Sequence, residues 1–180
     1  MGGMKYAGSV AASVAIPGKI IRFLEEGANT AYAGARDRDL VPRGYRVSGW
    51  QIDATGCRLT ALIPASADPR LLEALLDNGA IALTFEEVGT HETYQIKGRY
   101  LSHRPVRTAE IDIASRTRER FGKALRSLYR DERFTALAKA SIPDPTVAVE
   151  VEVREVFLQT PGPGAGGRIV PPPDTVASVR

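Results

Sequence analysis

The chain has 180 residues, of which 43% are hydrophobic and 25% charged, and its formal net charge is +3. These values are typical of a single soluble domain and give no indication of nucleic-acid binding. The one cysteine, Cys57, excludes an internal disulfide and suits a reducing compartment, so we expect a cytoplasmic protein. Only two histidines accompany this cysteine, which argues against a dedicated zinc site.

The N-terminal residues carry no strong targeting signal. Residues 6–15 are small and mildly apolar behind Lys5, but they lack the apolar centre of a secretory signal. No run in the chain reaches the roughly 18 apolar residues of a membrane-spanning helix, so no membrane association is expected. We expect residues 1–15 to be a flexible leader.

The first half of the chain predicts strands around two short helices. Pro17 suits the first position of a helix, where its missing N–H needs no partner, and Gly27 is a typical stop. A second helix is announced by Asp68 and Pro69 and is closed by an Asn-Gly pair. The runs typical of strands cover residues 30–36, 44–53 and 57–63, and the second helix covers residues 69–77.

The second half predicts longer elements. The valines of the last strand alternate and then change phase at Arg154 and Glu155, which predicts a β-bulge. Residues 161–180 hold five prolines and four glycines, so we expect an extended or disordered tail. The predicted strands are 80–86, 92–102 and 147–158, and the predicted helices are 109–130 and 132–140.

Six strand-like runs, most of them joined by short turns, predict a small antiparallel barrel. A doubly wound parallel sheet would need regular alternation of strands and helices, whereas three runs here follow one another before the second helix. The fold class is therefore mainly β with α, in one domain over residues 16–160.

The start of the second helix is a candidate phosphate site. A helix start presents free N–H groups and a partial positive charge, and Arg70 could add a bidentate clamp there. Ser66 could donate a hydroxyl, and Arg46 and Ser48 share one face of a strand that could pass nearby. The alternative is a helix start without a ligand, because Asp68 would itself occupy the N–H groups and repel an anion.

Several segments together resemble the pyridoxamine 5'-phosphate oxidase-like family of FMN-binding split barrels. The resemblance runs from about Ile16 to Leu101, roughly half the chain, with a further piece near the end. Its motifs are diffuse rather than signature-like. The pieces are IPGKIIRFLEEG, RGYRVSGWQID, CRLTALIPASADPRLLEALLDNGAIALTF, TYQIKGRY and VFLQTPGPGAG.

The resemblance implies an antiparallel split β-barrel with peripheral helices and a homodimer that holds FMN at the subunit interface. It implies an FMN-dependent oxidoreductase acting on a small molecule, which it does not identify. It nominates no general acid or base, so catalytic residues stay unassigned. The residues that it places near the cofactor are Arg46, Ser48, Trp50, Ser66, Arg70, Thr93 and Gln95.

Two other functions remain open at this point. A haem-binding split barrel would use a histidine, and His91 and His103 are the residues to test for that. A dimeric flavin-binding or stress protein without catalysis would need no further residues. The basic run from Arg116 to Arg133 is diluted by acidic residues and has few aromatic side chains, which favours a solvated amphipathic helix over a nucleic-acid surface.

Overall fold

The computed structural model of this chain describes residues 13–64 and 70–170. Most of the predicted leader, the end of the predicted tail, and the predicted site residue Ser66 with the cap pair Asp68 and Pro69 lie outside the described residues. The described elements are α1 (Gly18–Glu26), β1 (Asn29–Arg36), β2 (Pro42–Val47), β3 (Gly49–Ile52), β4 (Arg58–Ile63), α2 (Arg70–Asn78), β5 (Ala80–Glu87), β6 (Thr93–Pro105), α3 (Thr108–Tyr129), α4 (Arg133–Ser141), β7 (Val147–Leu158) and β8 (Arg168–Val170).

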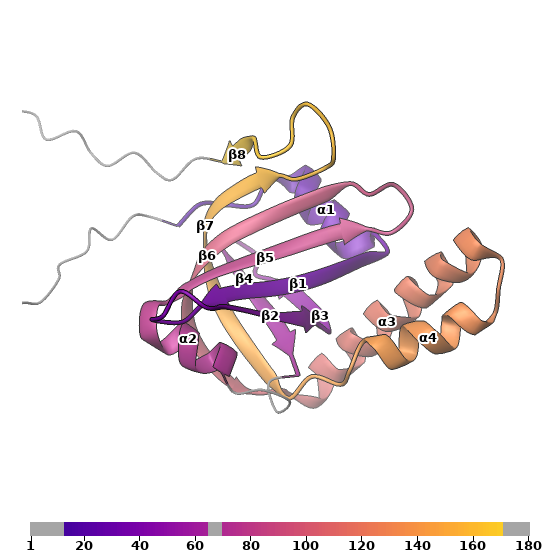
Figure 1. Ribbon diagram of the computed structural model, residues 1–180, viewed down its shortest axis with the longest axis horizontal. Coiled ribbons are helices and arrows are strands. Elements are labelled where there is room, and N and C mark those ends of the chain that lie inside the picture. Colours follow the sequence, from indigo (N-terminus) through magenta and orange to yellow (C-terminus); the bar gives the residue numbers. More distant parts are fainter. Residues whose placement is uncertain (1–12, 65–69, 171–180) are drawn as a thin grey trace, which may run out of the picture.

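One curled antiparallel sheet contains all the described strands (Figure 1). Its order is β2-β1-β5-β6-β7-β4-β3, with β8 added to β7. Every strand pair is antiparallel. The predicted fold class, an antiparallel split β-barrel with peripheral helices, is confirmed by this topology.

The sheet curls because β2 and β3, which are consecutive in the chain, lie at opposite ends of its strand order. Val47 pairs with Ala31 of β1, whereas Gly49 pairs with Leu62 of β4. Between them the Ser48 N–H donates to the Leu62 carbonyl at 2.8 Å. The single strand predicted over residues 44–53 is therefore wrong. The chain changes partners at Ser48 because one curled sheet must bring its two ends together.

The inner face of the sheet forms the hydrophobic core. Alternate side chains of each strand point to this face, and α1 packs its apolar stripe against it. The stripe exists because Ile20 and Leu24 are four residues apart. The largest core side chains include Leu24, Leu59, Leu83, Phe85, Ile96 and Val149.

A bulge bends the two longest strands where the sequence predicted it. Lys97 pairs with Glu155 and Gly98 with Val153, so Arg154 is the extra residue. The Cα of Gly98 faces β7 at very close range. A Cβ at this position would collide with Cγ1 of Val151 and lie 2.6 Å from the Glu152 carbonyl oxygen. Only glycine fits here without moving β7.

An ion pair anchors the start of α3. Arg104 donates to both carboxylate oxygens of Glu110, at 2.9 and 2.6 Å, and the Arg107 N–H donates to the same carboxylate at 2.7 Å. The guanidinium of Arg104, followed by this backbone N–H, lowers the pKa of Glu110 to about 2, although burial opposes the shift. A buried carboxylate with three donors is thus held ionised, which ties α3 to the end of β6.

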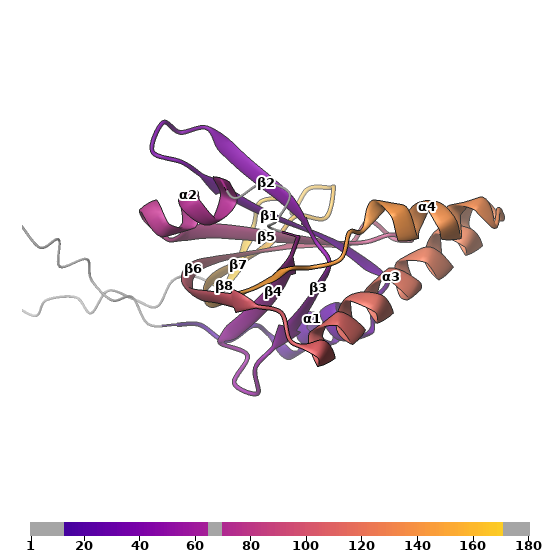
Figure 2. The same cartoon turned by 90° about the horizontal axis from the view of Figure 1, so that it is seen from below.

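The helices α3 and α4 lie side by side and extend beyond the sheet (Figures 1 and 2). They are the helices predicted over residues 109–130 and 132–140, with each end shifted by one residue. Part of the predicted tail continues the sheet, since Arg168–Val170 pairs with β7 as β8. Among the residues described, no helix is long and apolar enough to cross a membrane.

Candidate functional site

A wide hollow on the outer face of the sheet is the largest candidate site. Its volume is about 800 Å³, and it lies over β1, β2, β5 and β6, with one end at β7. We call this hollow the trough. Two cross-strand rows of outward-facing positions build it, because side chains two positions apart on a strand share a face. The rows are Arg46, Tyr32, Thr84, Gln95 and Phe157, and then Gly44, Gly34, Ala82, Lys97 and Glu155.

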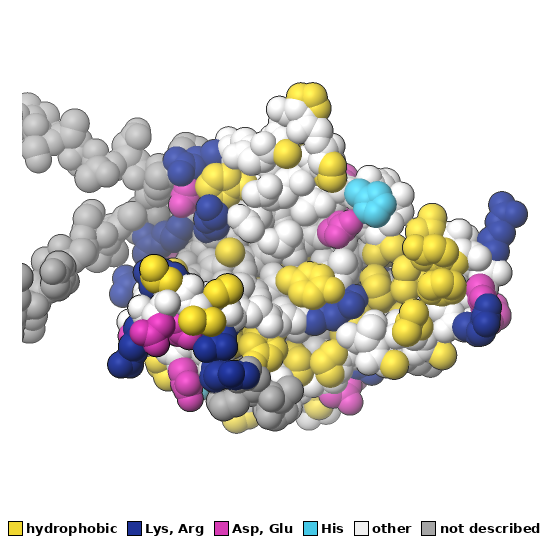
Figure 3. Space-filling model, viewed as in Figure 1, with side chains coloured by type: hydrophobic (Ala, Val, Ile, Leu, Met, Phe, Trp, Pro, Cys, Tyr) yellow, Lys and Arg dark blue, Asp and Glu magenta, His cyan; other side chains and the backbone are white. Residues whose placement is uncertain are grey.

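The floor of the trough is bare backbone. Gly34 and Gly44 face each other across β1 and β2, and Ala82 follows on β5. A Cβ at Gly34 would have its nearest neighbour at 3.9 Å, and a Cβ at Gly44 at 3.7 Å. Packing therefore does not require glycine at either place, and such glycines in strands mark sites where another group approaches the backbone. Figure 3 shows this face, which is largely white over β1, β5 and β6.

Polar and aromatic side chains lie along the trough and beside it. The Arg46 guanidinium lies 5.6 Å from the centre of the Tyr32 ring and donates to the Thr30 hydroxyl at 2.9 Å. On β6 the Gln95 amide donates to the Thr84 hydroxyl at 3.1 Å. Two residues further on, the ammonium group of Lys97 lies 4.4 Å from the centre of the Phe157 ring, as a cation–π contact.

The rim of the trough is rich in cations. Among the described residues, Arg36, Arg43, Lys97 and Arg154 line it with one carboxylate, that of Glu155, which is paired with Arg168 at 2.6 Å. Arg43 is paired with Asp37 at 2.9 Å, and Arg154 is paired with Glu152. Even so, Nε of Arg43 and Nη1 of Arg154 are buried donors that have no acceptor within the described part of the chain. Buried N–H groups of charged side chains are normally hydrogen-bonded, so these two donors favour an anionic ligand.

The carboxylate of Asp37 shapes one end of the trough. It accepts the N–H groups of Val41 and Asp39, at 2.9 and 3.1 Å, in addition to its pair with Arg43. The Val41 N–H, helped by Arg43, lowers the pKa of Asp37 below its usual value. The charged turn between β1 and β2 is thereby held in one conformation, and this places Arg43 at the trough.

The described members of the predicted cofactor set do not converge on one place in the chain. Gln95 lines the trough, and Arg46 stands beside it over Tyr32. Ser48 is fully buried, and its hydroxyl donates to the Pro143 carbonyl at 2.7 Å. The Trp50 indole donates to the Leu24 carbonyl at 3.1 Å and lines a separate cavity beside α1 and α3.

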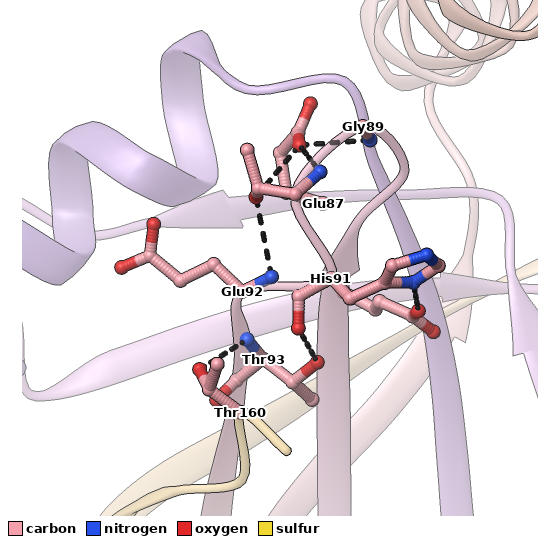
Figure 4. A network of polar contacts seen from close by, with 8 residues as sticks. Glu87, Gly89, His91, Glu92, Thr93 and Thr160 are labelled. Atoms are coloured by element: carbon pink, nitrogen blue, oxygen red, sulfur yellow. Dashed lines mark hydrogen bonds and ion pairs between the residues drawn. The ribbon is translucent and has the colours of Figure 1, made fainter. Parts of the chain in front are cut away.

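Thr93 belongs to the tight turn between β5 and β6 (Figure 4). Its N–H donates to the Thr160 hydroxyl at 2.9 Å, and its own hydroxyl donates to the His91 carbonyl at 2.8 Å. In the same turn the Glu87 carboxylate accepts the Gly89 N–H at 2.9 Å. The hydroxyl of Thr93 thus stabilises the turn, and its backbone groups are bonded to Gln159 and Thr160 after β7.

Each of the two histidines contacts a polar side chain near it in the sequence. Nδ1 of His91 lies 2.7 Å from the Glu86 carboxylate, and Nδ1 of His103 lies 2.6 Å from the Tyr100 hydroxyl. Neither histidine lines the trough.

Arg70 begins α2 and lines a smaller hollow of about 300 Å³. This hollow shares Arg43 with the trough. Its described lining includes three arginines but also four carboxylates, those of Asp37, Asp39, Glu73 and Asp77. Because carboxylates repel a phosphate, the trough rim suits an anion better than this hollow does.

Sequence reasoning missed most of the trough. Tyr32, Gly34, Arg43 and Lys97 come from three strands, and only the strand register brings them together. One signal was present, since Gly34 and Gly44 interrupt strand-like runs where β-propensity disfavours glycine.

No protein-family model matches the chain, and a comparison with curated proteins finds no match. Solved structures do resemble it. A putative pyridoxamine 5'-phosphate oxidase from Lactobacillus delbrueckii is 14% identical, with 79% of this chain and 93% of that chain covered and a TM-score of 0.48. An FMN-binding protein from Syntrophomonas wolfei is 10% identical, with 71% and 74% covered and a TM-score of 0.42.

A third neighbour is HutZ, described as the heme storage protein of Vibrio cholerae. It is 11% identical, with 81% of this chain and 95% of that chain covered and a TM-score of 0.42. The neighbours include pyridoxamine 5'-phosphate oxidase-like and FMN-binding proteins, which is the split-barrel family that the sequence resembles. At such identities and TM-scores, what each neighbour binds is a property of that neighbour alone.

Proposed function

We propose that this chain binds FMN in the trough and uses it for redox chemistry on a small molecule. The observation that carries the proposal is the bare floor of Gly34, Gly44 and Ala82 with cations around it. A flat ring needs such a floor, and a phosphate needs such cations. The volume of about 800 Å³ also lies in the range of small-molecule sites, roughly 300–1,000 Å³.

Each part of FMN has a chemically suitable partner in the trough. The flavin ring would lie over the glycine floor, where no side chain stands in its way. Arg36 and Arg43 are the candidates for the phosphate, because guanidinium groups bind phosphate through paired N–H donors. The Gln95 amide and the Lys97 ammonium could donate to polar atoms at the ring edge. FMN supplies the electron transfer, and these side chains supply binding and orientation.

A second copy of the chain would complete this site. The trough is open on its outer side, and Tyr32 at its edge is 50% exposed. A flavin ring lying there would keep one face in water unless another surface covered it. We therefore propose a homodimer that closes the trough, in line with the resemblance seen in the sequence. Light scattering should then give the mass of two chains.

The test is a titration of the purified protein with FMN. We expect quenching of flavin fluorescence, retention of the flavin band near ~450 nm on desalting, and a saturable affinity. The variant Gly34→Val should weaken binding by about ten-fold or more, a change of about 1.4 kcal/mol or more, because its side chain fills the floor.

Gly34→Ala is the matched control of intermediate size. Affinity should fall in the order glycine, alanine, valine, while the unfolding transition of all three proteins stays cooperative. Equal FMN affinity across this series would reject the trough as the flavin site. An intense Soret band after haem addition, without FMN binding, would instead support the haem-binding function, and a protein that binds neither would support the function without a cofactor.

A further inference from the structure

A second cavity lies apart from the trough and shares no lining residue with it. It has a volume of about 250 Å³ and is formed by the end of α1, by β3 and by α3. Trp50, Ile52 and Ile113 provide an apolar wall. Arg116 and Arg120 bring two guanidinium groups to the same cavity. The rest of the described lining is largely polar and includes the Asn29 and Gln51 amides and the carboxylate of Glu25. An apolar wall beside polar groups that can fix orientation is typical of a small-molecule site.

Asn29 lines this cavity and has an unsatisfied acceptor. The residue is only 1% exposed, and its amide Nδ2 donates to the Phe23 carbonyl at 2.6 Å. Its other amide atom, Oδ1, is buried and receives no hydrogen bond from any described residue. Buried side-chain oxygens normally have a donor, so this atom calls for an N–H or O–H from a bound molecule.

The Asn29 amide is held in place by its surroundings. A Cβ at Gly27 would lie 2.8 Å from Nδ2 and 3.0 Å from Oδ1 of Asn29, which shows how closely the backbone approaches the amide. Arg120 donates to the Glu25 carbonyl and so joins the end of α1 to α3. The Asn29 amide is thus fixed by both its hydrogen bond and its packing.

Arg116 of α3 adds a cation to the lining of the cavity. Its side chain is exposed, and no hydrogen bond or ion pair to a described residue engages it. Thr117, the next residue, turns its hydroxyl back to the Ile113 carbonyl at 3.0 Å. The one carboxylate in the described lining is that of Glu25, which is exposed at the end of α1. A guanidinium group without a partner is suited to a carboxylate.

We propose that this cavity is a second binding site, specific for a compact aromatic carboxylic acid that carries an N–H or O–H donor. The carboxylate pairs with Arg116, the donor satisfies Asn29 Oδ1, and the ring packs against Trp50 and Ile52. The site is independent of the flavin proposal, because it uses other residues. A ligand needs both a carboxylate for Arg116 and an N–H or O–H donor for Asn29. A molecule that has only one of these groups should bind more weakly.

The test uses calorimetric titration of the full chain, saturated with FMN if FMN binds, with three probes. 4-Hydroxybenzoate has both groups, benzoate lacks the hydroxyl, and 4-hydroxybenzyl alcohol lacks the carboxylate. We expect 4-hydroxybenzoate to bind about ten-fold or more tightly than either of the others, as the loss of a hydrogen bond to a charged or buried group implies.

Arg116→Gln separates the two ends of the site. It should weaken 4-hydroxybenzoate about ten-fold and leave 4-hydroxybenzyl alcohol unchanged, since only the carboxylate contacts Arg116. Lys123→Gln is the control, because it removes the same charge from the same helix at a position outside the cavity. No saturable binding of 4-hydroxybenzoate to the wild-type chain would overturn the proposal. Equal affinity in wild type and Arg116→Gln, or displacement of the probe by FMN, would overturn it as well.

Discussion

The two faces of the sheet use glycine for opposite reasons. Gly98 on β6 has no room for a side chain, because Val151 and the Glu152 carbonyl of β7 occupy that space. Gly34 on β1 has room, since its nearest neighbour would lie 3.9 Å from a Cβ. Packing therefore requires glycine at Gly98. At Gly34 packing does not require it, and the open space beside the backbone there is what indicates a ligand.

The charged groups show the same difference. At the start of α3 the Arg104 guanidinium and the Glu110 carboxylate satisfy each other, and Glu110 is 3% exposed. At the trough, buried N–H groups of Arg43 and Arg154 have no acceptor within the described residues. Satisfied charges hold the fold together, whereas unsatisfied ones remain for a ligand.

The largest expected effect is that of Gly98→Ala. The added methyl group should lower the free energy of unfolding by about 3 kcal/mol, because it can be placed only by moving β7. Urea denaturation would measure this loss. In contrast, Gly34→Ala should change stability by no more than about 1 kcal/mol, in either direction. Similar losses at the two positions would remove the distinction between the faces.

Glu110→Gln tests the contribution of the Arg104–Glu110 ion pair to stability. The pKa of Glu110 is lowered from 4.5 to about 2, so ionised Glu110 should contribute about 3 kcal/mol at neutral pH. We expect the variant to lose roughly this amount in denaturation at pH 7.

The pH dependence gives the sign of this effect. A lowered carboxyl pKa stabilises the fold above the unfolded value of about 4.5, and the contribution disappears as the pH falls toward about 2. Wild-type stability should therefore fall over this window, and the variant should show a smaller slope. The same slope in both proteins would mean that Glu110 is not held ionised by Arg104.

The smallest expected effect is that of Lys97→Gln at the trough. Loss of this cation should weaken FMN binding by about ten-fold, near 1.5 kcal/mol, and change stability by less than about 0.5 kcal/mol. Lys19→Gln on α1 is the matched control, because Lys19 is exposed and lies outside the trough. Fluorescence titration measures the FMN affinity of both variants. A loss of stability without a loss of affinity would mean that Lys97 stabilises the fold and does not bind FMN.

The candidate site was predicted less completely than the fold. The resemblance named Gln95 and Arg46, which lie at or beside the trough, but also Ser48 and Trp50, whose polar groups are engaged elsewhere. Alternation along a strand shows which residues share a face. It does not show which residues of the next strand stand opposite, and a site built across strands needs that register.

The sequence by itself determined the local elements. Pro17 and Gly27 bound α1, alternating runs became strands, and the change of phase at Arg154 became the bulge, because each depends on neighbours within a few residues. Tertiary structure alone decided the change of partners at Ser48 and the meeting of Gly34, Gly44 and Lys97 in one hollow. These features depend on which distant strands pair, and that pairing follows from burying one face of the whole curled sheet.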